Sequence, residues 1–504
     1  MDPSLVAFLV AFAASVLIAP LLASAARRLG IVDAPDSHRK THSHRIPLVG
    51  GPTILISGGL AFGLAMAFFP GVLIPDPSDL RFIRALSCAG LVVVVLGLAD
   101  DWVGLRGRQK LLGQLIAAVI MLTADVTITH VVFFGQEIQF GHFAPLITLA
   151  WILGGINALN LIDGVDGLAS TTGIVLSLSF AAVAYVLGGR HDDMVLALIL
   201  AGSLSGFLIH NFPPAKMFLG DSGSMLIGLV LGAVALKSSL KGIGAATLVM
   251  PTAIWAIPIF DVAMAVIRRT LTGRSIYATD RSHLHHCLER KGHRGSRLLL
   301  VVGSLCALTG LGAVFGSAMD NEWITLVAVG TALSLLVLTQ SFGHTEMGLV
   351  RRRVMRLVGS MVSRTPSNPE LLNDERVRLN GNHDWERLWV TLTEFADRFE
   401  MDRVELMVSL PVAGEEYHAV WRRDTSVEDH EAWKSEIPLI VAGMSVGHIR
   451  VAGAVGEGSI CEWMSGLIGG LQGFEDQLVV LIQELEDRAV PPVAVEAAVP
   501  ASTK

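Results

Sequence analysis

The sequence predicts an all-α polytopic membrane protein that carries a small soluble α+β domain in its C-terminal part. Hydrophobic residues make up 52% of the 504 residues and charged residues only 16%, with a mean hydropathy of +0.57. Soluble globular chains carry about 25% charged residues. Apolar runs of roughly twenty residues, long enough to cross ~30 Å of hydrocarbon, recur from the beginning of the chain to residue 341 and then stop.

The apolar runs predict about eleven transmembrane helices. The first run, from Leu5 to Ala26, follows no basic segment and is itself followed by Arg27 and Arg28, which favours a retained span with its N-terminus outside. Lys and Arg concentrate in the loops that follow odd-numbered spans, and the positive-inside rule places those loops in the cytosol. The polar motifs fall in the same loops, so we expect one site on the cytosolic face of the cell membrane. The predicted spans are 5–26, 47–69, 82–99, 110–126, 143–160, 168–188, 193–211, 223–237, 243–267, 297–317 and 322–341.

The chain after the membrane domain (1–343) has the composition of a soluble domain behind a basic linker at 344–367. Helical periodicity predicts helices at 385–399 and 460–486. We expect an α+β module of sensory or scaffolding type over 368–487 and a disordered Pro/Ala/Val-rich tail at 488–504. Short apolar and β-branched runs predict strands at 404–410, 417–421, 437–441 and 446–451.

Two adjacent carboxylates, Asp100 and Asp101, close the third predicted span. Adjacent carboxylates at a membrane edge repel each other, so we expect a cation or a shared proton there, and a hard oxygen-binding ion such as Mg²⁺ fits best. Lys110 opens the next span and offers a counter-charge. The alternative is a solvated acidic helix end beside a lysine that only anchors the topology.

A polar segment runs from Asn157 to Leu168 within the apolar sequence. Its two amides and two carboxylates, Asn157, Asn160, Asp163 and Asp166, recur at spacings of three, as one side of a helix end would place them. Ionisable groups at the edge of a bilayer usually line a polar cavity with a function. The two glycines of the segment allow a sharp turn and a close approach to a ligand. The segment therefore predicts a ligand site.

The loop before the eighth span begins at Asn211 and contains Lys216 and a Gly-Asp-x-Gly-Ser turn at 220–224. Amide N–H groups of a glycine-rich turn at a helix N-terminus bind phosphate groups. Asp221, within that turn, is placed to hold a metal ion that bridges to the phosphate. The alternative is an ordinary loop.

The longest and most basic internal loop contains Arg281, His283, His285 and His286. Three histidines within four positions could indicate zinc. No cysteine is suitably spaced, and the other motifs are rich in carboxylate and amide oxygens, which favour magnesium. We therefore interpret the arginine and the imidazoles as phosphate or nucleotide donors, against the alternative of a solvated polar loop.

The first internal loop, at 33–51, combines Lys40 and His42 with a Pro- and Gly-containing entry to the second span. These donors are suited to a lipid phosphate at the membrane interface, although topology alone also explains their charge. The four cysteines of the chain show neither a metal-binding spacing nor a disulfide framework.

Together these motifs resemble the polyprenyl-phosphate N-acetylhexosamine-1-phosphate transferases, over about residues 30–300. One departure is visible, because Gly104 stands where the family often has the last carboxylate of an Asp-Asp-x-x-Asp motif. The histidines followed by Cys-Leu-Glu-Arg-Lys-Gly are similar to the branch that uses UDP-N-acetylglucosamine or a related UDP-sugar. The phospho-N-acetylmuramoyl-pentapeptide transferases of peptidoglycan synthesis are the alternative branch. The matching motifs are Arg39-Lys40-x-His42, Pro47-x-x-Gly50-Gly51, Asp100-Asp101, the segment 157–168, Asn211-x-x-Pro214-Ala215-Lys216-x-Phe218-x-Gly220-Asp221-x-Gly223-Ser224 and His283-x-His285-His286.

The resemblance implies transfer of a sugar 1-phosphate from a UDP-N-acetylhexosamine to undecaprenyl or another polyprenyl phosphate, with release of UMP, at the start of a cell-envelope polysaccharide. It implies Mg²⁺, or Mn²⁺ in its place, held by Asn160 and Asp221. Asp100 or Asp101 would accept a proton from the lipid phosphate or position it for attack, and Asp163 and Asp166 would contact the nucleoside or sugar. A carboxylate nucleophile with a phospho-enzyme intermediate is the competing scheme.

A polytopic transporter is the rival interpretation from another class of protein. It predicts charged residues near the middle of the bilayer and internally repeated halves. Here the carboxylates lie at span ends on one face, and no repeat is evident in the sequence. A catalytically idle anchor for the C-terminal module would lack several acidic motifs, and all of them are present. We expect no nucleic-acid partner, and a homodimer stays open.

Overall fold

The chain divides into two compact units, Met1–His344 and Thr345–Lys504, in the computed structural model of the protein. The residues that the structure describes are 2–33, 45–69, 77–124, 126–133, 136–188, 191–240, 249–271, 282–344, 347–348, 350–351, 354, 374–380, 385–398, 401–410, 415–423, 432–441, 444–454, 478 and 482.

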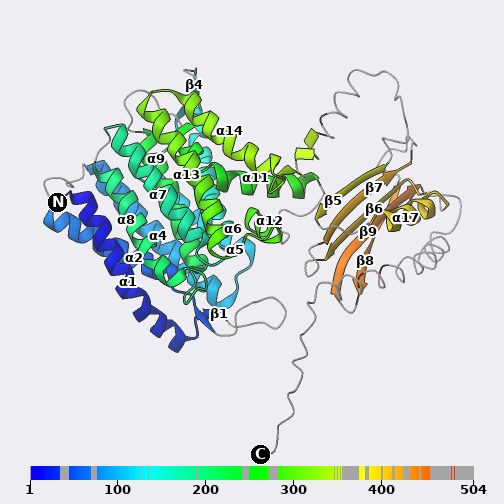
Figure 1. The fold of residues 1–504 in the computed structure, drawn as a ribbon, viewed down its shortest axis with the longest axis horizontal. Helices are drawn as coiled ribbons and strands as arrows, with labels where there is room; N and C mark the ends of the chain where they lie inside the picture. Colours follow the sequence, from blue (N-terminus) through cyan, green and yellow to red (C-terminus); the bar gives the residue numbers. More distant parts are fainter. Residues whose placement is uncertain are drawn as a thin grey trace, which may run out of the picture. The chain divides into compact units, whose positions relative to one another are not determined.

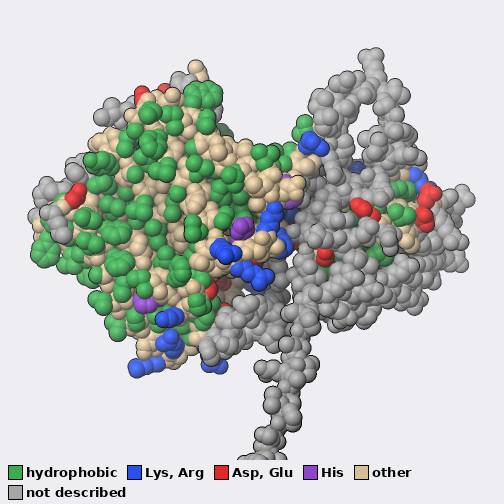
Figure 2. Space-filling view, in the orientation of Figure 1, with side chains coloured by type: hydrophobic (Ala, Val, Ile, Leu, Met, Phe, Trp, Pro, Cys, Tyr) green, Lys and Arg blue, Asp and Glu red, His purple; other side chains and the backbone are tan. Residues whose placement is uncertain are grey.

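The first unit is a helical bundle (Figure 1). Within its described residues, eight helices are long and apolar enough to cross a membrane. Figure 2 shows apolar side chains over most of the visible face of this bundle, as a lipid-facing surface requires. Two short hairpins, β1 (Val32–Asp33) with β2 (Ile46–Pro47) and β3 (His130–Phe133) with β4 (Gln136–Gln139), lie in its connections, and η1 (Gly141–Phe143) precedes α6. The helices are α1 (Pro3–Leu29), α2 (Gly50–Phe68), α4 (Pro77–Val103), α5 (Gly107–Leu122), α6 (Ala144–Ile162), α7 (Leu168–Val186), α8 (His191–Asn211), α9 (Gly220–Leu240), α10 (Val249–Ile254), α11 (Ala256–Leu271), α12 (Leu284–Arg290), α13 (Ser296–Ala318) and α14 (Glu322–Leu338).

Ten of the eleven predicted spans match one continuous helix each, although α5 and α14 are shorter than the eight long helices. The span predicted at 243–267 differs, because its described part is divided between α10 and α11. Pro258 explains the division. It has no N–H to donate to the carbonyl of Ile254, where α10 ends, and its ring crowds that carbonyl.

Helix α9 lies at the centre of the bundle, against α2, α4 and α6. Small residues allow its close approach to these neighbours, which is how transmembrane helices pack in the absence of a hydrophobic driving force. A Cβ atom at Gly97 of α4 would overlap the backbone of Ser222, and one at Gly51 of α2 would overlap the same serine. Gly155 of α6 and Gly228 of α9 pack against each other in the same way. The N-terminal end of α9 is therefore fixed against three helices.

The second unit contains one antiparallel sheet in the order β5-β7-β6-β9-β8. Its strands are β5 (Asp374–Asn380), β6 (Arg403–Leu410), β7 (Glu415–Arg422), β8 (Ala432–Val441) and β9 (Met444–Ala454), and α17 (Glu386–Arg398) packs on it through Trp389. The predicted helix at 385–399 and the four predicted strands are all present. Strand β5 was not predicted, because its Asp-Glu-Arg-Val-Arg-Leu-Asn sequence has few apolar residues. The helix predicted at 460–486 lies outside the described residues except for Leu478 and Ile482, which are buried in the same core. The predicted tail and most of the basic linker also lie outside them.

Candidate functional site

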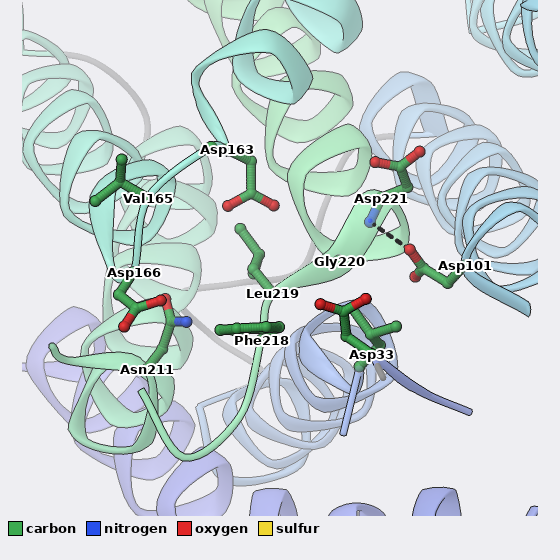
Figure 3. A pocket seen from close by; sticks show the side chains of 12 residues that line it. Asp33, Asp101, Asp163, Val165, Asp166, Asn211, Phe218, Leu219, Gly220 and Asp221 are labelled. Carbon is green, nitrogen blue, oxygen red and sulfur yellow. Dashed lines mark hydrogen bonds between the residues drawn. The ribbon is translucent and has the colours of Figure 1, made fainter. Parts of the chain in front are cut away.

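A cavity of about 280 Å³ lies where α4, α6 and α9 bring their polar ends together. Five carboxylates line it, from β1, the end of α4, the turn between α6 and α7, and the beginning of α9. Figure 3 shows Asp166 on one side of this cavity and the acids of β1, α4 and α9 on the other, with Asp163, Leu219 and Phe218 in between. The five carboxylates are Asp33, Asp101, Asp163, Asp166 and Asp221.

Asp101 and Asp221 are brought together by the packing of α4 against α9. The backbone N–H of Asp221 donates to Oδ1 of Asp101 over 3.0 Å (Figure 3). Gly220, with a φ of +71°, makes the turn that enters α9, and it lies against the carboxylate of Asp101. The second oxygen of Asp101 is buried and has no hydrogen-bond partner among the described residues. This oxygen therefore has unused capacity to accept a hydrogen bond or a proton.

Asp100 faces a different partner from its neighbour. Its Oδ1 accepts the backbone N–H of Leu105 over 2.6 Å, and its Oδ2 lies 3.0 Å from Nζ of Lys110. The same ammonium also pairs with Oδ2 of Asp221. Lys110 therefore bridges the acidic end of α4 to the beginning of α9 and supplies a positive charge next to two carboxylates.

Asn160 orients Asp221 from the side of α6. Its Nδ2 donates to Oδ1 of Asp221 over 2.8 Å and to Oγ of Ser224 over 3.0 Å. Asn157, one turn earlier, points elsewhere, because its Nδ2 donates to Oε1 of the buried Gln114 over 2.9 Å. The amide at position 160 thus belongs to the site, while the amide at position 157 joins α6 to α5.

The two remaining aspartates of the polar segment lie on the turn after α6. Oδ2 of Asp166 accepts the backbone N–H of Ala215 over 2.9 Å, which ties this turn to the loop before α9. Burial, followed by the nearby charges of Asp221, Asp101 and Asp166, raises the pKa of Asp163 well above its ordinary range. A positive charge brought into the cavity would reverse that effect.

The histidines are held by α12 and by a buried acid of α11. His283 lies 3.2 Å, through its Nδ1, from Oδ2 of Asp261, and the backbone N–H of Leu284 donates to Oδ1 of the same carboxylate over 2.9 Å. His285 is buried against Gly164 of the α6–α7 turn. Burial is the main cause that lowers the pKa of His285 to about 3, so this imidazole is neutral. The ring of His286 lies 4.1 Å from that of His285, centroid to centroid, on the more exposed side.

The other predicted site residues lie in less direct positions. Asn211 lines the cavity, but its amide is engaged internally, since Oδ1 accepts from Ser170 over 2.9 Å and Nδ2 donates to the carbonyl of Met217 over 2.9 Å. The side chain of Lys216 is exposed and is not part of the cavity lining. Three further predicted residues lie outside the described residues, namely Lys40, His42 and Arg281.

Sequence reasoning missed three residues of this region. Asp33 and Phe218 line the cavity, and Asp261 holds the histidines. Asp33 was included in a motif only as the beginning of a basic loop, and Phe218 only as part of a family pattern. Asp261 could have been found, because a carboxylate within a predicted transmembrane span indicates a functional site by default.

The arrangement suits phosphorylated ligands that need charge neutralisation. Within the described residues no group of three or more His, Cys, Asp or Glu side chains lies close enough together to form a metal site by itself. The carboxylate of Asp221, which lines this oxygen-rich cavity, fits Mg²⁺, because that ion commonly takes one or two carboxylates and completes its shell with water and substrate phosphates. The fold and site define a polytopic membrane protein with an acidic cavity at one end of its helices.

Comparison with known proteins identifies the family. Residues 83–239 match the model of glycosyl transferase family 4. The chain is 34% identical over 329 residues to the probable undecaprenyl-phosphate N-acetylglucosaminyl 1-phosphate transferase of Bacillus subtilis, covering 64% of this chain and 87% of the relative. It is 32% identical over 337 residues to the decaprenyl-phosphate N-acetylglucosaminephosphotransferase of Mycobacterium tuberculosis, covering 61% and 81%. It is also 33% identical over 355 residues to the phospho-N-acetylmuramoyl-pentapeptide-transferase of Desulforudis audaxviator, covering 63% and 99%.

The chain therefore belongs to the polyprenyl-phosphate N-acetylhexosamine-1-phosphate transferases of glycosyl transferase family 4. This confirms the resemblance that the motifs indicated. The matched region includes the end of α4, the polar segment after α6 and the beginning of α9, which form most of the cavity wall.

Proposed function

We propose that this protein transfers N-acetylglucosamine 1-phosphate from UDP-N-acetylglucosamine to undecaprenyl phosphate, or a related polyprenyl phosphate, and releases UMP. The observation that carries the proposal is the acidic cavity at the polar ends of apolar helices, where Asp101, Asp163 and Asp221 converge. A membrane-embedded site of this kind can take a lipid substrate from the bilayer and a nucleotide substrate from water. The named activities of the two N-acetylglucosamine-specific relatives support the choice of sugar.

The substrates explain why the site is both acidic and metal-dependent in this proposal. Two polyanions must be brought together, which requires charge neutralisation and positioning. We assign Mg²⁺ to Asp221, with Asn160 orienting that carboxylate through its 2.8 Å hydrogen bond. Bound there, the ion would neutralise charge on the diphosphate of the nucleotide sugar. Lys110 would then be left with Asp100, 3.0 Å away.

We assign different roles to the two adjacent aspartates. Asp101 lines the cavity and has one buried oxygen without a partner among the described residues, so it is our candidate for the group that accepts a proton from the lipid phosphate. Asp100 is engaged by Leu105 and Lys110, and it holds the lysine in place. Asp163 and Asp166, on the other wall, would contact the nucleoside or sugar. We assign phosphate binding to His283, His285 and His286, of which His285 packs behind Gly164 of the cavity wall.

We further propose that the cavity opens on the cytosolic side of the cell membrane. Basic side chains gather at one edge of the helical unit, around α12 and the end of α1 (Figure 2). They include Arg27 and Arg28 in the last turn of α1 and Arg290 in the last turn of α12, all of them exposed. The positive-inside rule assigns such an edge to the cytosol.

The test is an assay of UMP release and lipid-linked product in membranes that contain the full chain. Radiolabelled UDP-N-acetylglucosamine, UDP-N-acetylgalactosamine and UDP-N-acetylmuramoyl-pentapeptide are supplied in turn with Mg²⁺ or EDTA. We expect product from the first donor with Mg²⁺ and its loss in Asp101→Asn and Asp221→Asn variants. Wild-type activity in both variants would rule out the assigned site. Product from the pentapeptide donor alone would assign the protein to the other branch.

A further inference from the structure

Asp261 is an acid in an otherwise apolar stretch of α11, and the roles proposed above do not use it. Its side chain is only 1% exposed, and both of its oxygens face the beginning of α12. Oδ1 accepts the backbone N–H of Leu284 over 2.9 Å, and Oδ2 lies 3.2 Å from Nδ1 of His283. A buried carboxylate requires partners of this kind, because an unpaired buried charge is costly.

The contact with Leu284 fixes where α12 begins. The first N–H groups of a helix have no partner inside the helix, and His283, the N-cap residue, supplies no side-chain hydrogen bond to them. Asp261 supplies the missing hydrogen-bond acceptor from a different helix. Arg268, further along α11, donates to the carbonyl of Ser282 over 3.0 Å. Helix α11 therefore holds the backbone on both sides of His283.

The contact with His283 also determines which ring nitrogen carries the proton. A carboxylate accepts, so Nδ1 donates to it and carries a proton. A buried acid that fixes a histidine in one tautomer is the arrangement used to orient catalytic histidines in other enzymes.

The held element reaches the cavity through His285. Its ring lies parallel to that of His283, with 6.2 Å between the centroids. Both of its ring nitrogens are buried and have no partner among the described residues. The ring packs on Gly164, whose neighbours Asp163 and Val165 line the cavity. A displacement of the beginning of α12 would therefore move the imidazole that supports the cavity wall from behind Gly164.

We propose that Asp261 is a positioning residue for the transfer reaction, which it serves by holding His283 in the Nδ1–H tautomer and fixing the beginning of α12. This inference rests on the proposed function. It predicts that Asp261 acts through His283 and not through general stability of the bundle.

The test begins with Asp261→Asn, which keeps the size of the side chain. Leu284 still needs an acceptor, so the asparagine oxygen stays with its N–H and the amide nitrogen faces His283. The ring must then accept at Nδ1 and carry its proton on Nε2. We expect kcat/KM for UDP-N-acetylglucosamine to fall about 10- to 100-fold, since misplacement of a positioned group by about 1 Å can cost 10²-fold. The melting temperature of the purified full chain should stay near that of the wild type.

A double-mutant cycle with His283→Gln separates positioning from stability. If Asp261 acts through the histidine, the double variant loses no more activity than His283→Gln alone. The matched control is Asp79→Asn, which removes a buried acid 3.5 Å from Lys237, at the opposite ends of the same helices α4 and α9 that form the site. Its effect should add to that of His283→Gln.

Three results would overturn the inference. The first is a wild-type kcat/KM in Asp261→Asn, and the second is additive losses of activity in the double-mutant cycle. The third is a loss of activity that parallels the fall in melting temperature to the same extent in the Asp261 and Asp79 variants. Failure of the proposed function looks different. In that case the wild-type protein itself makes no lipid-linked product from UDP-N-acetylglucosamine, whatever the variants do.

Discussion

Replacement of Gly97 by alanine tests whether close packing of α4 on α9 forms the site. A Cβ atom at this position would lie 2.8 Å from the carbonyl carbon of Asp221 and would also overlap the backbone of Ser222. Ordinary carbon contacts are about 3.5–4.0 Å, so the two helices must separate by about 1 Å. The 3.0 Å hydrogen bond from the N–H of Asp221 to Asp101 cannot survive that separation unchanged. We expect about 100-fold less transfer and a loss of about 1–3 kcal/mol in the free energy of unfolding.

Two other glycines provide a graded control for this substitution. A Cβ atom at Gly90, on the same face of α4, would lie 3.3 Å from Cδ1 of Leu226, a flexible atom that can move, so Gly90→Ala should have a mild effect. A Cβ atom at Gly63 of α2 meets nothing within 4 Å, so Gly63→Ala should keep full activity and slightly raise stability. The assay is UMP release in membranes, paired with thermal melts in detergent. A folded Gly97→Ala protein with wild-type activity would refute the argument that this contact fixes the carboxylates.

Three further predictions concern single side chains of the site. The pKa of His285 is lowered to about 3, so below its ordinary pKa of about 6.5 this imidazole binds a proton in the unfolded chain but not in the folded one. The free energy of unfolding of the wild type should therefore fall by about 2 kcal/mol between pH 7 and pH 5. Denaturant melts of the His285→Asn variant should lack this contribution. Lys110→Met removes a cation that faces Asp100 and Asp221, so the variant should reach half-maximal activity at a lower Mg²⁺ concentration than the wild type, with about 10-fold slower transfer. A higher half-maximal Mg²⁺ concentration in the variant would contradict this. Asn160→Ala removes an amide that donates to a carboxylate, and kcat/KM should fall about 10-fold with the melting temperature kept, whereas an unchanged kcat/KM would argue against its role.

The helices were predictable from the sequence because membrane spans are set by one strong physical requirement. An apolar stretch must cover the hydrocarbon thickness, and this signal does not depend on tertiary contacts. The exception shows what the signal omits. The stretch at 243–267 is apolar throughout most of its length, but Pro258 divides its described part between two helices. Hydropathy reports the surroundings of a segment and not the continuity of its backbone.

The polar segment after α6 shows how far spacing alone can lead. Residues three apart share a face only while the helix lasts, and α6 ends at Ile162. Asn160 is still helical and meets Asp221, while Asp163 and Asp166 reach the cavity from a turn that Gly167, with a φ of +73°, completes. Asn157 shares the spacing but faces α5. The pattern identified the segment correctly, and only packing could assign each member.

Isolated residues were the hardest to predict. Asp33 and Asp261 belong to no local pattern, since Asp33 meets the other acids of the cavity only in the fold and the partners of Asp261 come from another helix. Their importance arises from contacts between distant parts of the chain, which a single sequence does not reveal. A carboxylate in an apolar helix is nevertheless a usable signal, because its burial requires a partner or a function.

Charge balance links these separate features to the reaction we propose. Five carboxylates surround a cavity of about 280 Å³, and Lys110 faces two aspartates at its edge. The substrates would add further negative charge from a diphosphate and a lipid phosphate. Such a cavity would repel both substrates unless a cation entered with them, so we expect nucleotide binding and Mg²⁺ binding to depend on each other. A neutral His285, packed behind Gly164 of the cavity wall, adds no positive charge that could neutralise the substrates. On this argument the metal would overcome repulsion between the polyanions, and the α12 segment, held by Asp261, would support the cavity wall at Gly164.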